Sequence, residues 1–296
     1  MCTTFALIKL ASRQVAKIGG HLYSISGIIA ISCTIAAPVL AQDDNREDSL
    51  LEFFAGQGCA IGPTTRAAAI AAGYNAHEID LLGARAWPDS GTVWTRGWLV
   101  LPPSICQIRV PEVNNLIQLS DPEVIASLSA PDAYTSQGEP GCFLSADILQ
   151  EQVQKTRNWD EDTAFVEYLR FLSASLISGD LAFYSDSPLK TPAGFIVATG
   201  ECANIPLMPA IKRNHELMIK HFGAFIRANA ANTICEYGGS IMGAGWHEIA
   251  DTLTDGKNTN AWLSFEYQII AMGAGWYEDI SYTNHGMPRP PLCHYE

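Results

Sequence analysis

Apolar residues recur at every third or fourth position in several stretches of this chain, which is the spacing of an amphipathic α-helix. The clearest stretch spans residues 161–177, and Gly179 follows it as a typical helix terminator. A second long stretch with the same spacing covers residues 209–230. Shorter helices are predicted over residues 65–72, 76–86 and 122–128. Helices therefore make up most of the predicted fold.

Strand signals are short and lie close together along the chain. Residues 92–94 and 98–101 flank a turn and are rich in Val, Trp and Leu, so they predict a β-hairpin. Residues 183–199 alternate short apolar pieces with proline-containing turns. Within residues 50–110, two helices followed by the hairpin form a helix-turn-helix plus β-hairpin segment, which is the element order of a winged helix. We predict an α+β fold that is mainly α, with short and local strands.

One segment near the C-terminal end occurs twice. Residues 236–248 read EYGGSIMGAGWHE and residues 266–278 read EYQIIAMGAGWYE, so eight of thirteen positions agree. Each copy has the pattern of a helix that ends at a glycine and is followed by an aromatic residue that packs back over the turn. We predict two helical hairpins with Trp246 and Trp276 in the core. They would stack through Gly243 and Gly245 of one copy and Gly273 and Gly275 of the other.

The duplicated segment also has a chemical interpretation. Trp246 and Trp276 could line one cleft and, together with His247, hold sugar rings or other flat ligands. Glu248 and Glu278 would then act as an acid and base pair, as glycoside hydrolysis requires. The distance between the two carboxylates decides this chemistry, and the sequence does not give that distance.

The first 41 residues differ in composition from the rest of the chain. Their only charged side chains are three basic ones near the start, and residues 22–41 are uncharged and largely apolar. Val39 and Ala41 place small residues at the −3 and −1 positions, so residues 1–41 are predicted to be a secretory signal peptide. Cleavage after Ala41 leaves residues 42–296 as a single periplasmic or secreted domain. The alternatives are an uncleaved membrane anchor and lipidation at Cys33.

Six cysteines follow the predicted cleavage site: Cys59, Cys106, Cys142, Cys202, Cys235 and Cys293. An even number in an exported chain predicts disulfides. The sequence does not choose among the possible connectivities, but pairing of neighbours would bracket three possible subdivisions, residues 50–110, 142–230 and 235–293. Each such bond would add about 4 kcal/mol by closing its loop in the unfolded chain. Gly62 stands three residues after Cys59 in place of a second thiol, which favours a disulfide there over a redox site.

Charge and motif content exclude several function classes. Residues 42–296 hold 15 Lys and Arg against 31 Asp and Glu, a net formal charge of −16. A surface this acidic repels nucleic acid and anionic lipid. We therefore expect no nucleic-acid binding and no membrane association after cleavage. The histidines lack metal-ligand spacing, and phosphate-binding glycine loops and a G-x-S-x-G nucleophile motif are absent. We therefore expect neither a metal nor a cofactor.

The leading interpretation is a non-catalytic, disulfide-stabilised structural or binding module outside the cytoplasm. The alternative is an envelope hydrolase that acts on glycan through the Glu248 and Glu278 pair. The partner would be an envelope component or a glycan.

Overall fold

The computed structural model describes residues 40–129, 141–192, 194–241, 243 and 245–296. All but the last two residues of the predicted signal peptide lie outside the described residues, and so does Cys33. Within the described part, no helix is both long enough and apolar enough to cross a membrane.

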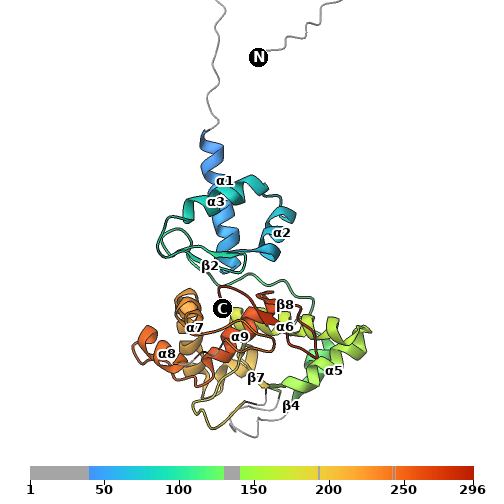
Figure 1. Ribbon diagram of the computed structural model, residues 1–296. Helices are drawn as coiled ribbons and strands as arrows, with labels where there is room; N and C mark the ends of the chain where they lie inside the picture. The colour runs from blue at the N-terminus through green and yellow to red at the C-terminus, as the bar shows by residue number, and fades with distance from the viewer. Residues whose placement is uncertain (1–39, 130–140, 193, 242, 244) are drawn as a thin grey trace, which may run out of the picture. The chain divides into compact units, whose positions relative to one another are not determined.

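The first part of the described chain combines three helices with an antiparallel sheet of strand order β1-β3-β2 (Figure 1). Its elements are α1 (Leu40–Gly56), β1 (Ala60–Ile61), α2 (Pro63–Ala71), α3 (Ala76–Ala86), β2 (Val93–Thr95) and β3 (Trp98–Val100). The Asn75 side chain accepts a hydrogen bond of 2.8 Å from the backbone N–H of His77 and so caps the start of α3. Phe54, Ile79 and Leu99 bury the apolar faces of these elements in one core.

Helix α1 begins well before the apolar residues that start at Leu50. Its first half is polar, so hydrophobic spacing does not predict it. Two ion pairs hold this half against α3: Arg46 with Glu78 at 2.6 Å, and Glu47 with Arg85. The start of α1 thus depends on contacts between segments that lie far apart in the sequence.

The second part contains a four-stranded antiparallel sheet of order β4-β5-β7-β6. Its elements are α4 (Pro122–Ser127), β4 (Leu128–Ser129), β5 (Phe143–Ser145), α5 (Ala146–Arg157), α6 (Glu161–Ser178), β6 (Leu181–Ala182), β7 (Gly194–Val197), the 3-10 helix η1 (Gly200–Asn204), α7 (Met208–Ala230), α8 (Trp246–Thr254), α9 (Leu263–Gly273), β8 (Tyr277–Glu278) and β9 (Met287–Pro288). Together with the first part, these elements form an α+β fold that is mainly helical.

The four-stranded sheet corrects the prediction of local strands. Strands β5 and β7 are neighbours, with Leu144 opposite Phe195, although α5 and α6 lie between them in the sequence. A Cβ atom on Gly194 would lie 2.1 Å from the carbonyl oxygen of Leu144, so only glycine fits where β7 passes β5. Strands β5 and β7 are too short to give a clear pattern, and they lie about 50 residues apart along the chain.

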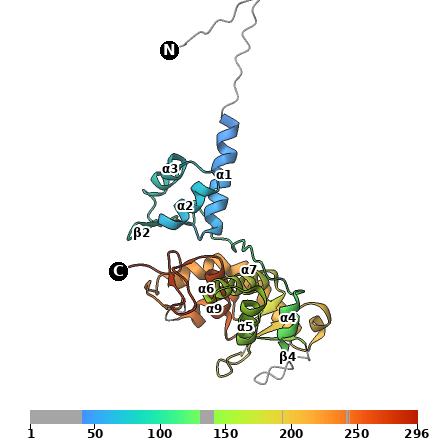
Figure 2. The same ribbon diagram turned by 90° about the vertical axis from the view of Figure 1, so that its right-hand side faces the viewer.

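Helices α6 and α9 lie side by side in two perpendicular views (Figures 1 and 2). A Cβ atom on Gly273 would lie 2.4 Å from Cβ of Ser173, so the two helices approach as closely as glycine allows. The Ser173 hydroxyl donates to the carbonyl of Ile270 at 3.0 Å across this contact. On the other side of α9, the Tyr267 ring stacks on Phe225 of α7 at 4.2 Å between centroids. Helix α9 is therefore the centre of the core.

The prediction of disulfides is confirmed, and the bonds pair neighbouring cysteines, which is one of the connectivities that the sequence left open. Disulfides join Cys59 to Cys106, Cys142 to Cys202, and Cys235 to Cys293. All six cysteines are buried.

The two copies of the duplicated segment fold differently, so they do not form two similar helical hairpins. In the second copy, α9 runs to Gly273 and β8 follows. In the first copy, the described residues 236–241, 243 and 245 are not helical, and α8 begins only at Trp246. The first copy has Gly238, Gly239 and Ser240 where the second has Gln268, Ile269 and Ile270. Glycine disfavours a helix by about 1 kcal/mol per residue, and this exchange also removes two apolar anchors.

Candidate functional site

Trp276 occupies the interior rather than a cleft. Its side chain is 0% exposed and lies 6.0 Å from Phe222 between ring centroids. The backbone of Gly275 is left-handed (φ 73°), and the N–H of Trp276 donates to the carbonyl of Ala271 at 2.9 Å, which closes the end of α9. The Trp276 ring thus has no surface on which a sugar could stack.

Glu278 is held by another part of the chain. The hydroxyl of Thr64, in the first turn of α2, donates to its carboxylate at 3.1 Å. The same carboxylate acts electrostatically on Arg289, where it raises the pKa against the larger, opposite effect of burial. These contacts give Glu278 a role in holding β8 against α2.

Trp246, His247 and Glu248 lie in the first turn of α8. Trp246 is half-buried against the core, and its ring lies 3.5 Å from that of His247 between centroids. His247 and Glu248 are exposed. In Figure 1, α8 and β8 lie on different sides of α9. The structure therefore does not bring Glu248 and Glu278 into one cleft, and the two-carboxylate chemistry has no support from their placement.

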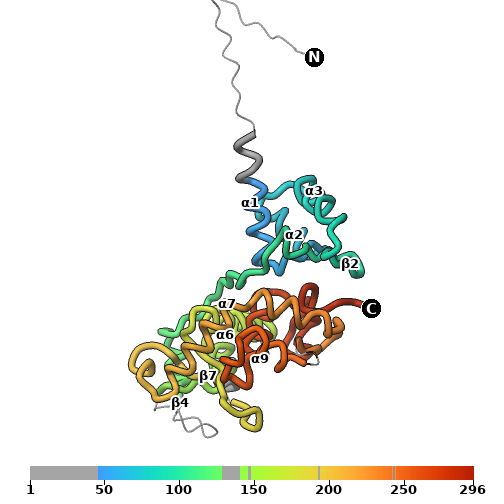
Figure 3. The backbone as a smooth tube through the Cα atoms, turned by 90° about the vertical axis from the view of Figure 1, so that its left-hand side faces the viewer, coloured from blue at the N-terminus to red at the C-terminus, as the bar shows by residue number. Residues whose placement is uncertain are grey.

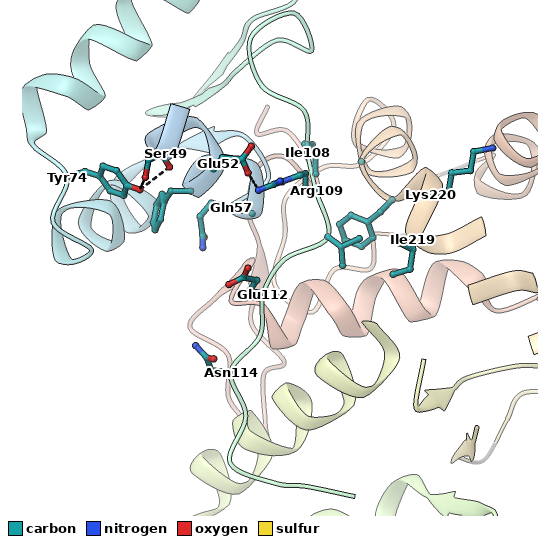
Figure 4. Close-up of a pocket in the computed structure, with 15 residues that line it drawn as sticks. Ser49, Glu52, Gln57, Tyr74, Ile108, Arg109, Glu112, Asn114, Ile219 and Lys220 are labelled. Atoms are coloured by element: carbon teal, nitrogen blue, oxygen red, sulfur yellow. Dashed lines mark hydrogen bonds and ion pairs between the residues drawn. The ribbon is translucent and has the colours of Figure 1, made fainter. Parts of the chain in front are cut away.

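A cavity of about 930 Å³ lies elsewhere, between α1, the coil of residues 108–114 and α7 (Figure 4). We call it the α1–α7 groove. Volumes of this order are typical of ligand sites in proteins. Its residues come from four separate parts of the sequence, so no local motif predicts it.

The α1 wall of the groove carries both aromatic and charged groups. Phe53 and Tyr74 are in ring contact with centroids 5.6 Å apart. The Tyr74 hydroxyl lies 2.7 Å from that of Ser49, which orients the phenol ring. Glu52 forms an ion pair with Arg109 of the coil. This pair spans two walls of the groove, as Figure 4 shows.

The coil and α7 form the opposite wall. A Cβ atom on Gly223 would lie 2.2 Å from the carbonyl oxygen of Ile108, so glycine lets the coil pass directly over α7. The Arg227 guanidinium donates to the carbonyl of Cys106 at 2.8 Å, next to the disulfide to Cys59. The coil is thereby fixed at the end where it enters the groove. Further along, the exposed side chains of Glu112, Asn114 and Lys220 border the opening.

Gln57 connects the groove to the C-terminal segment. Its side-chain oxygen accepts a hydrogen bond of 3.0 Å from Arg289. Arg289 is fully buried, with its guanidinium 5.2 Å from the ring centroid of Trp98 and 5.9 Å from that of Trp276. Burial lowers the pKa of Arg289 to about 10, which leaves it charged at neutral pH. This arginine locks the end of α1 to the C-terminal segment.

The C-terminal segment also reaches the first sheet, as Figure 3 shows. Tyr295 donates its backbone N–H to the Thr95 hydroxyl at 2.9 Å and accepts from it at 3.1 Å. Hydrogen bonds from the C-terminal segment therefore hold both the end of α1 and the first sheet.

Polar and apolar side chains both line the groove. Among the described residues that line it there is no histidine and no cysteine, and one of its two carboxylates, Glu52, is neutralised by Arg109. Within the same described residues, no group of three or more metal-ligating side chains is close enough to hold a metal ion. The lining offers apolar contact, two amides and paired charges.

No protein-family model, curated protein or solved structure matches this chain.

Proposed function

We propose that this protein is an exported, non-catalytic binding module whose ligand lies in the α1–α7 groove. The observation that carries the proposal is the groove itself, which is large, open and built from rigidly fixed walls without an acid and base pair. Three disulfides support a compartment outside the cytoplasm, as does the signal-peptide pattern of residues 1–41.

A polypeptide segment of an envelope component suits the groove best. Apolar side chains such as Phe53 and Ile219 line it together with the charged side chains of Glu112 and Lys220. Such a mixture matches a chain with side chains of several kinds better than a purely apolar ligand. The helices and hairpin of residues 50–110 would then act as a winged-helix-like scaffold for the α1 wall, because the acidity of the protein opposes DNA.

The groove is tested by photo-crosslinking in cells. The protein, expressed with its own signal sequence, carries p-benzoylphenylalanine in place of Asn114 or Lys220. Leu189, which is 94% exposed and outside the groove, is the matched control position. We expect a discrete adduct from both groove positions and none from Leu189. No adduct from the groove positions, or the same adducts from all three, would contradict the proposal.

A charge exchange makes the test specific. Arg109→Glu places two acidic side chains side by side and should weaken the adduct formed at Lys220 at least several-fold. The double exchange Glu52→Arg with Arg109→Glu restores the ion pair in reverse and should recover the adduct. If the single exchange has no effect, the walls of the groove do not hold the ligand.

Export is tested on the purified protein. Mass spectrometry of the periplasmic fraction should find Gln42 as the first residue. A thiol assay under denaturing conditions should find no free thiol, because all six remaining cysteines are paired. A retained N-terminal segment or a persistent free thiol contradicts the corresponding part of the proposal.

A further inference from the structure

Two tryptophans are exposed side by side at the surface of the first sheet. Trp87, at the end of α3, is 63% exposed, and Trp94, on β2, is 58% exposed. Their rings meet edge to face, with centroids 5.6 Å apart and planes inclined by 71°. Large aromatic side chains cost free energy when left in water, so a pair of exposed rings in contact marks a candidate recognition surface.

The pair borders a hollow of about 460 Å³ that is separate from the α1–α7 groove. Part of its lining is formed by the small residues Gly83, Ala84 and Gly97. The hollow is also lined by Arg66 and Asp80, which form an ion pair of 2.6 Å. This pair lowers the pKa of Asp80, whose carboxylate is charged and accepts hydrogen bonds at neutral pH.

The backbone that carries the two rings is held in place without a ligand. The turn between them is fixed by Asp89, which accepts from the backbone N–H of Gly91 at 2.8 Å and from the Ser104 hydroxyl at 2.6 Å. Ser104 lies two residues before Cys106, whose disulfide to Cys59 fixes this part of the chain. A preformed site of this kind loses little conformational freedom on binding.

We propose that the Trp87–Trp94 hollow binds a neutral oligosaccharide. The C–H face of a pyranose ring stacks on an indole, and its equatorial hydroxyls bond to the Asp80 carboxylate and the Arg66 guanidinium at the hollow. A hollow with exposed rings and charged hydrogen-bonding groups fits this ligand. The net charge of −16 after residue 41 opposes the alternative, docking of the two rings into an anionic membrane surface.

Binding is measured by isothermal titration with cellohexaose and chitohexaose, two soluble β-linked oligosaccharides with equatorial substituents. We expect the protein to bind at least one of them. Trp87→Ala and Trp94→Ala should each weaken binding tenfold or more, and Asp80→Asn several-fold. Tyr237→Ala removes a comparably exposed aromatic side chain, 61% exposed, that does not line the hollow, and should leave binding unchanged.

Circular dichroism and the thermal midpoint establish that each variant is folded. Trp94→Phe keeps an aromatic ring, so its affinity should lie between that of the wild type and that of Trp94→Ala. The proposal is overturned if neither oligosaccharide binds at millimolar concentration, or if the two alanine variants bind as the wild type does. It is also overturned if only phosphatidylglycerol vesicles bind in a manner that depends on Trp87. Arg109→Glu should not change oligosaccharide binding, so this site and the α1–α7 groove can fail independently.

Discussion

The two copies of the duplicated segment place the same residues in very different surroundings. Tyr267 and Trp276 of the second copy are almost completely buried, whereas Tyr237 of the first is 61% exposed and Trp246 is half-buried. Glu266 is buried and Glu236 is exposed. Identity at eight of thirteen positions therefore does not specify a common structure. The five positions that differ, together with the contacts of each copy, decide the outcome.

The contacts of the first copy explain its irregular backbone. Cys235 ties its start to Cys293 near the C-terminal end. Gly238 is left-handed (φ 64°), and a Cβ atom on Gly239 would lie 2.7 Å from the carbonyl oxygen of Glu236. The second copy instead buries Ile269 and Ile270 in the core, and α9 is stabilised by that burial. The copy that carries the two isoleucines is helical because they are buried in the core, and the copy that carries glycines in their place is not.

The largest expected difference between the copies is at their tryptophans. Trp276→Ala should lower the free energy of unfolding by about 3–5 kcal/mol, because it empties a fully buried site and removes a ring that contacts Arg289. Trp246→Ala should lower it by about 1 kcal/mol, since its ring is only half-buried. Urea unfolding with the disulfides intact measures both. Equal losses would mean that the two rings are equally important to the core.

Local signals in the sequence predict those elements that carry their own start and stop residues. Asn75 and Gly179 mark helix ends where the structure has them, at the start of α3 and the end of α6. The sheet with β5 beside β7 and the polar half of α1 have no such local signal, because their partners lie far away in the sequence. The pattern of glycine followed by an aromatic residue correctly predicts a helix end before Gly275 and Trp276. In the first copy the prediction is wrong, because Gly245 precedes the start of α8 and the described residues 236–241 and 243 before it are not helical.

The candidate sites were less predictable than the fold. Glu52, Arg109 and Lys220 meet in one groove only because Gly223 lets the coil cross α7 and the Cys59–Cys106 disulfide holds that coil. The sequence showed the cysteines but not the crossing. The duplicated segment also led to the prediction that Trp246 and Trp276 line a site. Trp87 and Trp94 are the more exposed tryptophans, and exposure depends on the whole fold.

The glutamates of the two copies should differ in their effect on pH dependence. Burial raises the pKa of Glu266 to about 8, although the backbone N–H of Phe183 and the Asn260 amide donate to its carboxylate. Folding therefore favours the protonated form. The stability contributed by this group is fully present below its ordinary pKa of about 4.5 and is lost as the pH rises toward 8. Glu266→Gln should flatten the fall of stability between pH 5 and pH 8, and Glu236→Gln should not.

The contribution of other titrating groups near Glu266 must be separated from that of Glu266 itself. His215 and Glu266 line one cavity, which lies between α6, α7 and α9. Burial lowers the pKa of His215, so the stability that His215 contributes is lost in the opposite direction, as the pH falls. Unfolding of the wild type and both variants by urea at pH 5, 6, 7 and 8 isolates the part that belongs to Glu266. A profile that Glu266→Gln leaves unchanged would show that this carboxyl does not change its proton binding on folding.

The smallest difference is expected at the glycines that begin the Gly-Trp pairs. Gly245 and Gly275 have the same left-handed backbone, with φ of 82° and 73°, although one precedes α8 and the other follows α9. A Cβ atom would meet nothing closer than 3.5 Å at either position. Gly245→Ala and Gly275→Ala should therefore each lower the free energy of unfolding by about 1 kcal/mol, the cost of a left-handed alanine.

Gly56→Ala is the matched control, because a Cβ atom there also meets nothing within 4 Å and the backbone is helical rather than left-handed. Urea unfolding should show it to be neutral or slightly stabilising. A loss at Gly275 much larger than at Gly245 would mean that the closure of α9 through Trp276 depends on this glycine beyond its backbone angle. Equal losses would show that both positions require glycine for the same left-handed backbone. This conformation follows the end of α9 at Gly275 and precedes the start of α8 at Gly245.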